Sequence, residues 1–430
     1  MTEVIEKTEY KKGYKKTKLG WIPENWDILK FKEMYNFLST GSNSRNELNS
    51  TGEYLYIHYG DIHCKYKNIL NCSKIEIPHI NKDKVMNLPE LKDKDLIFVD
   101  ASEDYEGITK CTEIKNVNNR KIVSGLHTLL LRPKKDISPG YGGYIASNPI
   151  VNKNIKKMAN GWKVYGISKD NLSKIFFVLP GKKEQEKIVE ILSAWDDGIE
   201  TLEKLIEQKE IFHKALMKNL LIGKIRISGY NSKWTHSKFN SIFERITRKN
   251  EELNSNILTI SAQNGLISQK DFYNKRIASV DTSKYILLKN GEFAYNKSYS
   301  NGYPLGAIKR LDLYEKGVVS SLYICFKLNN SDNCSDFWKY YFEAGMLNRE
   351  IKMIAQEGAR NHGLLNMATE DFFNMLLFYP KDLKEQQKIA EILNKSDKEI
   401  QLLNSKLEKL KEQKKGLMQK LLTGQIRVKV

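Results

Sequence analysis

The sequence predicts an α+β protein in which two similar globular domains are separated by two long helices. The helices are expected to pair as an antiparallel coiled coil, so that the chain has a pseudo-twofold internal repeat. Two observations carry this prediction. The stretch EQEKIVEIL beginning at Glu184 returns as EQQKIAEIL at Glu385, 201 residues later, and LMKNLLIGKIRI at 216–227 returns at the same offset as LMQKLLTGQIRV. Apolar residues in both copies follow the same heptad spacing.

Composition limits the class of protein. The chain has 430 residues, a formal net charge of +18 and a mean hydropathy of −0.52. The basic excess favours a polyanionic partner, which could be DNA, RNA or an anionic membrane, and no apolar run approaches the roughly 20 residues that span a bilayer. Five cysteines without a C-x-x-C motif argue against a disulfide framework or a zinc ribbon. We therefore expect a reduced, cytoplasmic protein with no membrane partner.

A metal site is not expected either. Two cysteines and three histidines are close in sequence, but their spacings match no common metal site. These residues are His58, His63, Cys64, Cys72 and His79.

The chain divides into five segments. A basic arm comes first. Its charged residues are not followed by the apolar core of a secretion signal, so we expect the arm to be solvated. Two globular domains and two long helices then alternate, and each helix ends at a glycine, Gly223 or Gly424, where a C-cap glycine is expected. The segments are the arm at 1–18, the first domain at 19–180, the first helix at 181–223, the second domain at 224–380, and the second helix with a tail at 381–430.

The apolar positions of both helices form a narrow seam with alternating spacings of four and three residues. Two unrelated amphipathic helices would not explain why the seam keeps the same phase in both copies. The apolar seam residues are Ile188, Leu192, Trp195, Ile199, Leu202, Ile206, Leu216, Leu220, Ile389, Leu393, Ile400, Leu403, Leu407, Leu410, Leu417 and Leu421.

Polar interruptions of the seam favour antiparallel pairing. If partners are residues whose numbers add to 609, His213 meets Ser396 and Trp195 meets Lys414, the latter as a cation–π pair. Parallel pairing matches these residues less well.

The domains repeat more weakly than the helices. Trp26 in IPENWDILKF answers Trp234 in YNSKWTHSKF, and VSGLHTLLLRP at 123–133 answers VSSLYICFKL at 319–328. Short apolar runs between turn residues indicate a mainly antiparallel sheet in each domain. The first helix is followed by a lead-in with Trp234, so the repeat predicts a matching lead-in after the second helix. That lead-in, LGWIPENW, instead stands at 19–26, and the order of segments therefore matches a ring of two repeats opened at one junction.

These features resemble the DNA-specificity subunit of type I restriction–modification enzymes. The residues that carry the resemblance are Trp26 and Trp234 with their lead-ins, LPGKKEQEKIVEIL, YPKDLKEQQKIAEIL, LLIGKIRI and LLTGQIRV. The resemblance implies two target-recognition domains held by an antiparallel coil, double-stranded DNA as ligand, and two modification (methyltransferase) subunits with restriction (motor/nuclease) subunits as partners. It also implies that S-adenosylmethionine binds to the modification subunits and not to this chain, and that methylation falls on adenine. The outer faces of the helices at 184–190 and 385–391 are then expected to dock those partners.

Helix geometry agrees with this reading. About 33 residues of seam at 1.5 Å each give a rod of about 50 Å, which matches about 15 base pairs of DNA. Because the loops of the two domains differ, the resemblance predicts a split, asymmetric target with an unread spacer between unlike half-sites.

Three catalytic motifs are each incomplete in the sequence. LLIGKI has one glycine where a nucleotide-binding P-loop needs two. SNPIV at 147–151 lacks the second proline and the aromatic residue of an adenine methyltransferase motif, and GYGGY at 140–144 lacks the spacing of a dinucleotide loop. The chain is therefore expected to be a non-catalytic subunit.

DNA-reading residues are expected among Arg, Lys, Asn and Gln on loops, because their side chains match base edges and phosphates. The candidate segments are 41–46, 63–67, 118–121, 245–250, 296–303 and 358–362. The candidate residues are Arg45, Lys65, Lys67, Arg120, Arg248, Asn296, Lys297, Arg360 and Asn361. The alternative for each is an ordinary solvated loop, and for Asn296 a turn-forming role.

Two rival functions remain open at this point. One is an architectural coiled-coil spacer that binds DNA without regard to sequence. The other is a self-contained methyltransferase–nuclease, against which the missing motifs count.

Overall fold

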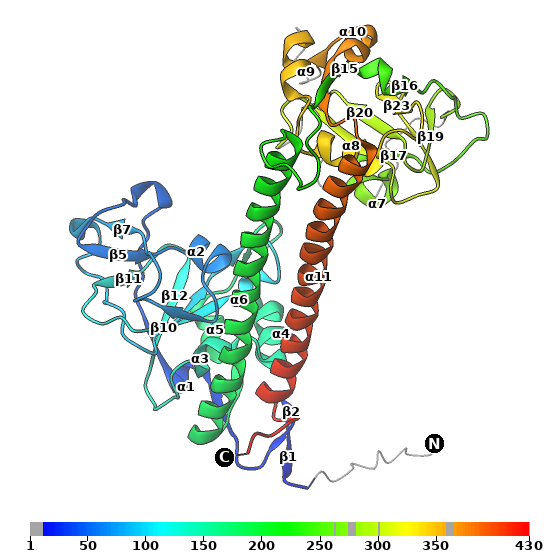
Figure 1. Ribbon diagram of the computed structural model, residues 1–430. Helices are drawn as coiled ribbons and strands as arrows, with labels where there is room; N and C mark the ends of the chain where they lie inside the picture. Colours follow the sequence, from blue (N-terminus) through cyan, green and yellow to red (C-terminus); the bar gives the residue numbers. More distant parts are fainter. Residues whose placement is uncertain (1–11, 262–263, 274–280, 300–301, 358–364, 430) are drawn as a thin grey trace, which may run out of the picture. The chain divides into compact units, whose positions relative to one another are not determined.

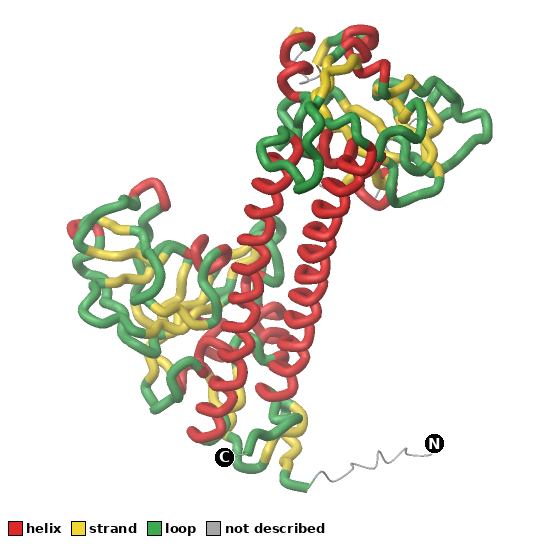
Figure 2. The backbone as a smooth tube through the Cα atoms, in the orientation of Figure 1, coloured by secondary structure: helices red, strands yellow, loops and turns green. Residues whose placement is uncertain are grey.

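The computed structural model describes residues 12–261, 264–273, 281–299, 302–357 and 365–429. Contacts divide the chain into two compact units, one of residues 1–202 with 406–430 and the other of residues 203–405. Each unit holds one domain and half of each long helix (Figure 1). The predicted class, α+β with two similar domains and two long packed helices, is confirmed. Figure 2 shows the strands gathered in the domains.

The first domain is built on a five-stranded sheet in the order β4–β12–β8–β10–β6. The pairing of β10 with β6 is parallel and the other three pairings are antiparallel. Its strands are β4 (Tyr35–Leu38), β12 (Thr128–Pro133), β8 (Leu96–Val99), β10 (Cys111–Lys115) and β6 (Ile69–Asn71). All four side chains of β8 are buried, which fits a central strand covered on both faces.

Smaller sheets and short helices complete the first domain. The sheets are β11 (Ile122–Ser124) with β5 (Tyr54–Ile57) and β7 (His79–Ile80), β3 (Asp27–Lys30) with β14 (Phe176–Leu179), and β9 (Ala101–Ser102) with β13 (Tyr165–Gly166). The helices are α1 (Phe31–Met34), α2 (Tyr59–Cys64), α3 (Tyr141–Ile145), α4 (Pro149–Met158) and α5 (Lys169–Lys174). Asn148 caps α4 by accepting a hydrogen bond from the Ile150 amide at 2.9 Å.

The basic arm is partly structured. Strand β1 (Tyr14–Thr17) pairs with β2 (Gly20–Pro23), and the Lys18 ammonium lies 3.2 Å from the centroid of the Phe176 ring. Tyr14 donates a hydrogen bond of 2.7 Å to the Gly424 carbonyl. Hairpin pairing and ring contacts thus order residues 12–18 while most of their side chains, including Lys15, Lys16 and Lys18, stay exposed to solvent, and residues 1–11 lie outside the described part of the chain.

The second domain repeats the scaffold of the first. Its four-stranded sheet has the order β16–β23–β20–β21, which corresponds to β4–β12–β8–β10. The strands of this sheet are β16 (Phe243–Arg245), β23 (Ile324–Leu328), β20 (Phe293–Asn296) and β21 (Ala307–Arg310). The remaining strand pairs are β15 (Thr235–Lys238) with β26 (Leu376–Tyr379), β17 (Leu258–Ser261) with β18 (Gly265–Ser268), β19 (Ile286–Lys289) with β22 (Lys316–Val319), and β24 (Gln356–Glu357) with β25 (Leu365–Asn366). The helices are α7 (Gln269–Tyr273), α8 (Ser335–Glu343), α9 (Asn348–Ile354) and α10 (Thr369–Asn374).

Two helices of 40 residues each, α6 (Lys182–Leu221) and α11 (Leu383–Leu422), pair antiparallel within each unit. In the first unit Lys414 forms an ion pair of 2.5 Å with Asp196, and in the second His213 lies 3.2 Å from Asp397. Both pairs add to 610, one more than the predicted sum, so the antiparallel prediction is confirmed. Each of the predicted apolar seam residues is buried or half-buried.

The predicted cation–π pair of Trp195 with Lys414 is not formed. The Lys414 ammonium pairs with Asp196 and lies 5.8 Å from the centroid of the Tyr144 ring. A carboxylate one residue beyond Trp195 offers the ammonium a full opposite charge, which exceeds the attraction of an aromatic face.

The repeated Glu-Gln pair at the start of each helix is buried and anchors the domain. Glu184 accepts a hydrogen bond from Trp26 Nε1 at 2.8 Å and two from Arg427, at 2.6 and 2.8 Å. Gln185 accepts from the Ser138 amide and donates to the Pro180 carbonyl. The two side chains thus join the domain, the start of α6 and the C-terminal tail.

The second unit contains the same arrangement. Glu385 accepts hydrogen bonds from Trp234 Nε1 at 3.2 Å and from Arg226 at 2.9 and 3.2 Å. Gln386 accepts from the Cys334 amide and donates to the Pro380 carbonyl. Because Glu184 is 3% and Glu385 1% exposed, the expectation that they lie on outer docking faces is wrong: each carboxylate is turned inward to an Arg and a Trp.

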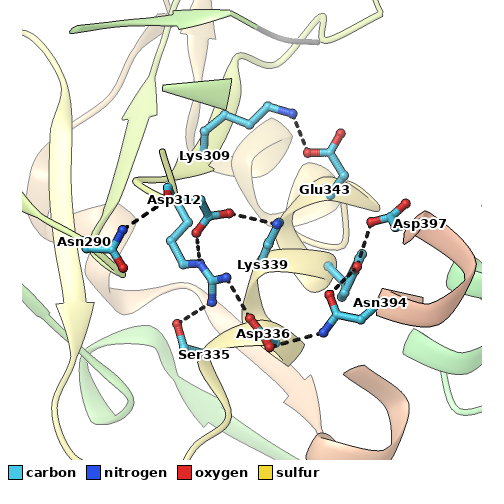
Figure 3. A network of polar contacts seen from close by, with 11 residues as sticks. Asn290, Lys309, Asp312, Ser335, Asp336, Lys339, Glu343, Asn394 and Asp397 are labelled. Carbon is cyan, nitrogen blue, oxygen red and sulfur yellow. Dashed lines mark hydrogen bonds and ion pairs between the residues drawn. The ribbon is translucent and has the colours of Figure 1, made fainter. Parts of the chain in front are cut away.

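A polar network binds the second domain to α11 (Figure 3). Arg310 donates hydrogen bonds to Asp312 at 2.6 Å and to Asp336 at 2.7 Å, and Asp336 accepts one from Asn394 of α11 at 3.2 Å. The Tyr340 hydroxyl bridges α8 to Asn394 and Asp397 at 2.9 and 2.7 Å. This network fixes the side of the second domain that packs on α11.

Both long helices end as predicted. Gly223 and Gly424 adopt φ angles of 71° and 73°, the left-handed conformation of a C-cap glycine. Within the described residues, no helix is long and apolar enough to cross a membrane.

Candidate nucleic-acid interface

In the first domain two candidate residues surround one buried carboxylate. Asp61 of α2 is 1% exposed and lies 3.0 Å from Arg45 and 3.3 Å from Lys65. Neither contact has hydrogen-bond geometry, so the two cations hold Asp61 mainly by charge. Arg45 and Lys65 keep 48% and 63% of their side chains exposed. The structure thus gives both residues a role in the fold and leaves their DNA contacts as predictions.

The other two candidates of this domain are also engaged. Lys67 forms an ion pair of 3.2 Å with Glu200 of α6. Arg120 donates a hydrogen bond to the Cys72 carbonyl. A polar pocket adjoins Lys67, where Lys110, Asn68, Ser147 and Asn152 line the walls. Two ammonium groups beside amides and a hydroxyl are suited to a phosphate oxygen.

Sequence reasoning missed an aromatic cluster on the same domain. The Tyr59 ring is flanked by His58, His63 and His127 at centroid distances of 4.6, 5.9 and 5.2 Å. Burial, and after it the charge of Arg45, lowers the pKa of His58, which favours its neutral form. In the sequence His58 was considered only as a metal ligand, although His63 was included in the DNA-reading segment 63–67, and histidine beside tyrosine is equally suited to stacking and hydrogen bonding with nucleic acid. The signal was the H-Y-x-x-x-H spacing at the start of a short helix.

In the second domain Arg248 is part of the scaffold. Its guanidinium forms an ion pair of 2.5 Å with Glu292 and donates to the Leu287 carbonyl at 3.2 Å. Asn296 accepts a hydrogen bond from the Ser298 amide at 3.0 Å, which is the turn-forming alternative. These contacts explain both residues without a ligand.

Lys297 lies where two candidate segments meet. Its carbonyl accepts a hydrogen bond of 3.1 Å from the Leu365 amide, at the start of β25. Strands β24 and β25 flank residues 358–364, which contain Arg360 and Asn361 and lie outside the described residues. The fold therefore brings the chain on one side of that segment next to Lys297.

A buried carboxylate in the first sheet has a role in folding. Glu113 of β10 is 1% exposed and accepts hydrogen bonds from the amides of Gly140 and Gly143, at the start of α3. Burial raises the pKa of Glu113 to about 7. The carboxyl group lies inside the domain and caps α3, so it takes no part in an open binding surface.

Comparison with known proteins shows a likeness to specificity subunits of type I restriction enzymes. The model of the type I restriction modification DNA specificity domain matches residues 23–211. A sequence from Methanocaldococcus jannaschii, named as the type I restriction enzyme MjaX specificity subunit, is 24% identical over 97% of both chains. The MjaVIII specificity subunit of the same organism is 27% identical over 51% of each chain.

Solved structures share the fold. The S subunit of a type I restriction–modification system from M. genitalium matches with a TM-score of 0.51 at 14% identity, covering 93% of this chain and 96% of that one. A chain from a structural study of assembly of the type I system matches with a TM-score of 0.57 at 12% identity, over 94% and 99%. At this identity the likeness concerns the fold alone. With a specificity domain matched over residues 23–211 and a second domain of the same strand order, the chain is similar to type I restriction–modification specificity subunits in sequence and in fold.

Proposed function

We propose that this chain reads a split, asymmetric DNA target, one half-site per domain, and positions two methyltransferase subunits and the restriction subunits of a type I complex. Methylation is performed by the partner subunits with S-adenosylmethionine, on an adenine of each half-site. The chain itself supplies sequence recognition and phosphate affinity.

The observation that carries the proposal is a duplicated scaffold with unlike loops. The same sheet order and the same Trp–Glu–Arg anchor occur twice. The loops that follow equivalent strands differ: β9 and the segment EDYEGITK follow β8, whereas NKSYSNGYPLG follows β20. One scaffold presenting two different sets of side chains is what recognition of two unlike half-sites requires.

Charge supports the same conclusion. A net charge of +18 favours a polyanion, and each phosphate contact made by Lys or Arg makes the affinity fall with salt. Binding should therefore weaken steeply between about 50 and 200 mM salt. A sequence-blind spacer would show the salt dependence without preference for one sequence.

The test is a genome-wide map of methylated adenines in cells that express the chain with its modification subunit, beside cells that lack the chain. We expect a motif of two unlike halves that appears only with the chain. Absence of chain-dependent methylation, with the complex shown to assemble, would support the architectural alternative.

Matched variants then assign the halves to the domains. Lys65→Gln in the first domain and Lys297→Gln in the second should each relax or weaken recognition of a different half-site, measured with duplexes altered in one half at a time. Equal effects of one variant on both halves would contradict reading by separate domains.

A further inference from the structure

The loop of residues 160–164, Asn-Gly-Trp-Lys-Val, exposes an aromatic side chain completely. Trp162 is 100% exposed, and Val164 beside it is 53% exposed. A tryptophan presents up to about 250 Å² of largely apolar surface, whose exposure to water forgoes several kcal/mol of burial. Its position at the surface therefore indicates a contact with something outside this chain.

The loop is built to present this residue. Asn160 and Gly166 exchange two backbone hydrogen bonds of 3.0 and 2.8 Å, which close the loop at its base. Gly161 has a φ angle of 144°, and a Cβ there would lie 1.8 Å from the Val164 carbonyl oxygen. The loop is thus a tight turn that only glycine permits, and Trp162 stands at its tip with little freedom in the backbone.

The base of the loop is continuous with the domain. Strand β13 pairs with β9, and the Tyr165 and Tyr105 rings are in contact, with centroids 4.0 Å apart and planes tilted by 37°. His63 Nε2 lies 3.1 Å from the Ala101 carbonyl of β9. The loop is therefore joined through β9 to α2, whose C-terminal neighbours Lys65 and Lys67 are DNA-reading candidates.

The neighbourhood is polar and has a basic excess. Lys153, Lys157 and Lys163 are exposed, and none of them has a carboxylate within 4 Å among the described residues. The acidic groups nearby in the chain are in the segment after β9. Of these, Glu106 is paired by Lys156, Asp104 accepts a hydrogen bond from the Gly107 amide, and Glu103 is exposed.

This setting distinguishes DNA from a protein partner. Protein-docking surfaces are contiguous apolar patches of several hundred Å², whereas Trp162 stands among asparagine, glycine and lysine, with Val164 in the loop and Tyr105 at its base as exposed apolar neighbours. A single aromatic ring flanked by cations is typical of residues that stack on bases or wedge between base steps.

From this we infer that Trp162 contacts DNA bases, stacking on or wedging into a base step of the half-site read by the first domain, while Lys163 and Lys157 bind the flanking phosphates. The inference rests on the proposed function and names a contact within it.

The experiment uses the chain assembled with its modification subunits and a fluorescent duplex carrying the methylated motif. Trp162→Ala should raise the Kd by at least about fivefold, since loss of one aromatic–base stack costs about 1–3 kcal/mol. Trp162→Phe should retain most of the affinity. Trp21→Ala removes a second exposed tryptophan, 36% exposed on strand β2, and should change the Kd less than twofold.

A structural readout accompanies the affinity. Duplexes with 2-aminopurine scanned through the half-site should show one position whose fluorescence rises with the wild-type complex and not with Trp162→Ala. A Kd within twofold of wild type for Trp162→Ala, or failure of that variant to assemble with the modification subunits, would overturn the inference. If the wild-type complex shows no preference for the motif, the proposed function fails. If the wild-type and Trp162→Ala complexes prefer the motif equally, only the inference about Trp162 fails.

Discussion

Arg427→Met should detach the C-terminal tail from the first unit and destabilise that unit. In the native structure Arg427 donates two hydrogen bonds to Glu184, at 2.6 and 2.8 Å, and the Glu184 side chain is 4% exposed. The substitution removes the charge partner of a buried carboxylate and leaves it the single hydrogen bond from Trp26.

The magnitude follows from burial and geometry. Removing one partner of a fully buried ion pair costs about 3–5 kcal/mol. Because Arg427 is 35% exposed and water can reach part of the vacated site, we expect about 2–3 kcal/mol. In a double-mutant cycle with Glu184→Gln, which keeps the acceptor for Trp26 and removes the charge, the coupling should be about 1.5 kcal/mol or more.

The assay is urea unfolding monitored by amide hydrogen exchange, which reports the protection of each unit separately. Arg226→Met is the matched control, because Arg226 holds Glu385 in the second unit by the same contacts. We expect Arg427→Met to lower protection in residues 12–202 and Arg226→Met in residues 203–405. A coupling below about 0.5 kcal/mol, or loss of protection in the same unit for both variants, would refute the reasoning.

Three further predictions follow from single sites. Burial raises the pKa of Glu113 to about 7, above its usual value of 4.5. The protonated Glu113 should therefore contribute its full stabilisation of the first unit below pH 4.5, and this stabilisation should be lost as the pH rises through 7. Glu113→Gln should flatten the profile of unfolding midpoint against pH. Tyr340→Phe removes two hydrogen bonds to α11 and should cost the second unit about 1–3 kcal/mol in urea unfolding, while Tyr144→Phe, which loses the bond to Asp196, should act on the first unit. Gly161→Ala should distort the loop and weaken binding of the target duplex without lowering the melting temperature of the first unit, and unchanged binding would contradict the role given to the loop.

The long helices and their antiparallel direction were predictable because both depend on patterns in the local sequence. A heptad seam in two copies at a constant offset predicts paired helices, and polar residues such as His213 and Lys414 indicate which ends meet. Ion pairs with Asp397 and Asp196 confirm the direction to within one residue. Their exact partners were not predictable, because a neighbouring carboxylate competes with any aromatic ring.

The anchors and the exposed loop were not predictable. A glutamate on a charged helix is expected in water, and Glu184 is buried only because Trp26 and Arg427, 158 and 243 residues away in sequence, reach it. Trp162 is expected in a core by residue type. Its exposure depends on backbone hydrogen bonds between Asn160 and Gly166 that close the loop. No periodic pattern in the sequence predicts this closure.

The discontinuity of the first unit has a consequence for how the protein is made. Residues 203–405 are contiguous, so the second unit can complete its contacts as soon as that stretch has left the ribosome. The first unit cannot complete its contacts until residues 406–430 have been synthesised. The hydrogen bonds of Tyr14 to Gly424 and of Asn148 to Leu422 join groups 410 and 274 positions apart. During synthesis the domain translated first is therefore the one finished last, and until the tail arrives its unpaired stretch of α6 exposes the apolar seam to chaperones and to other nascent chains.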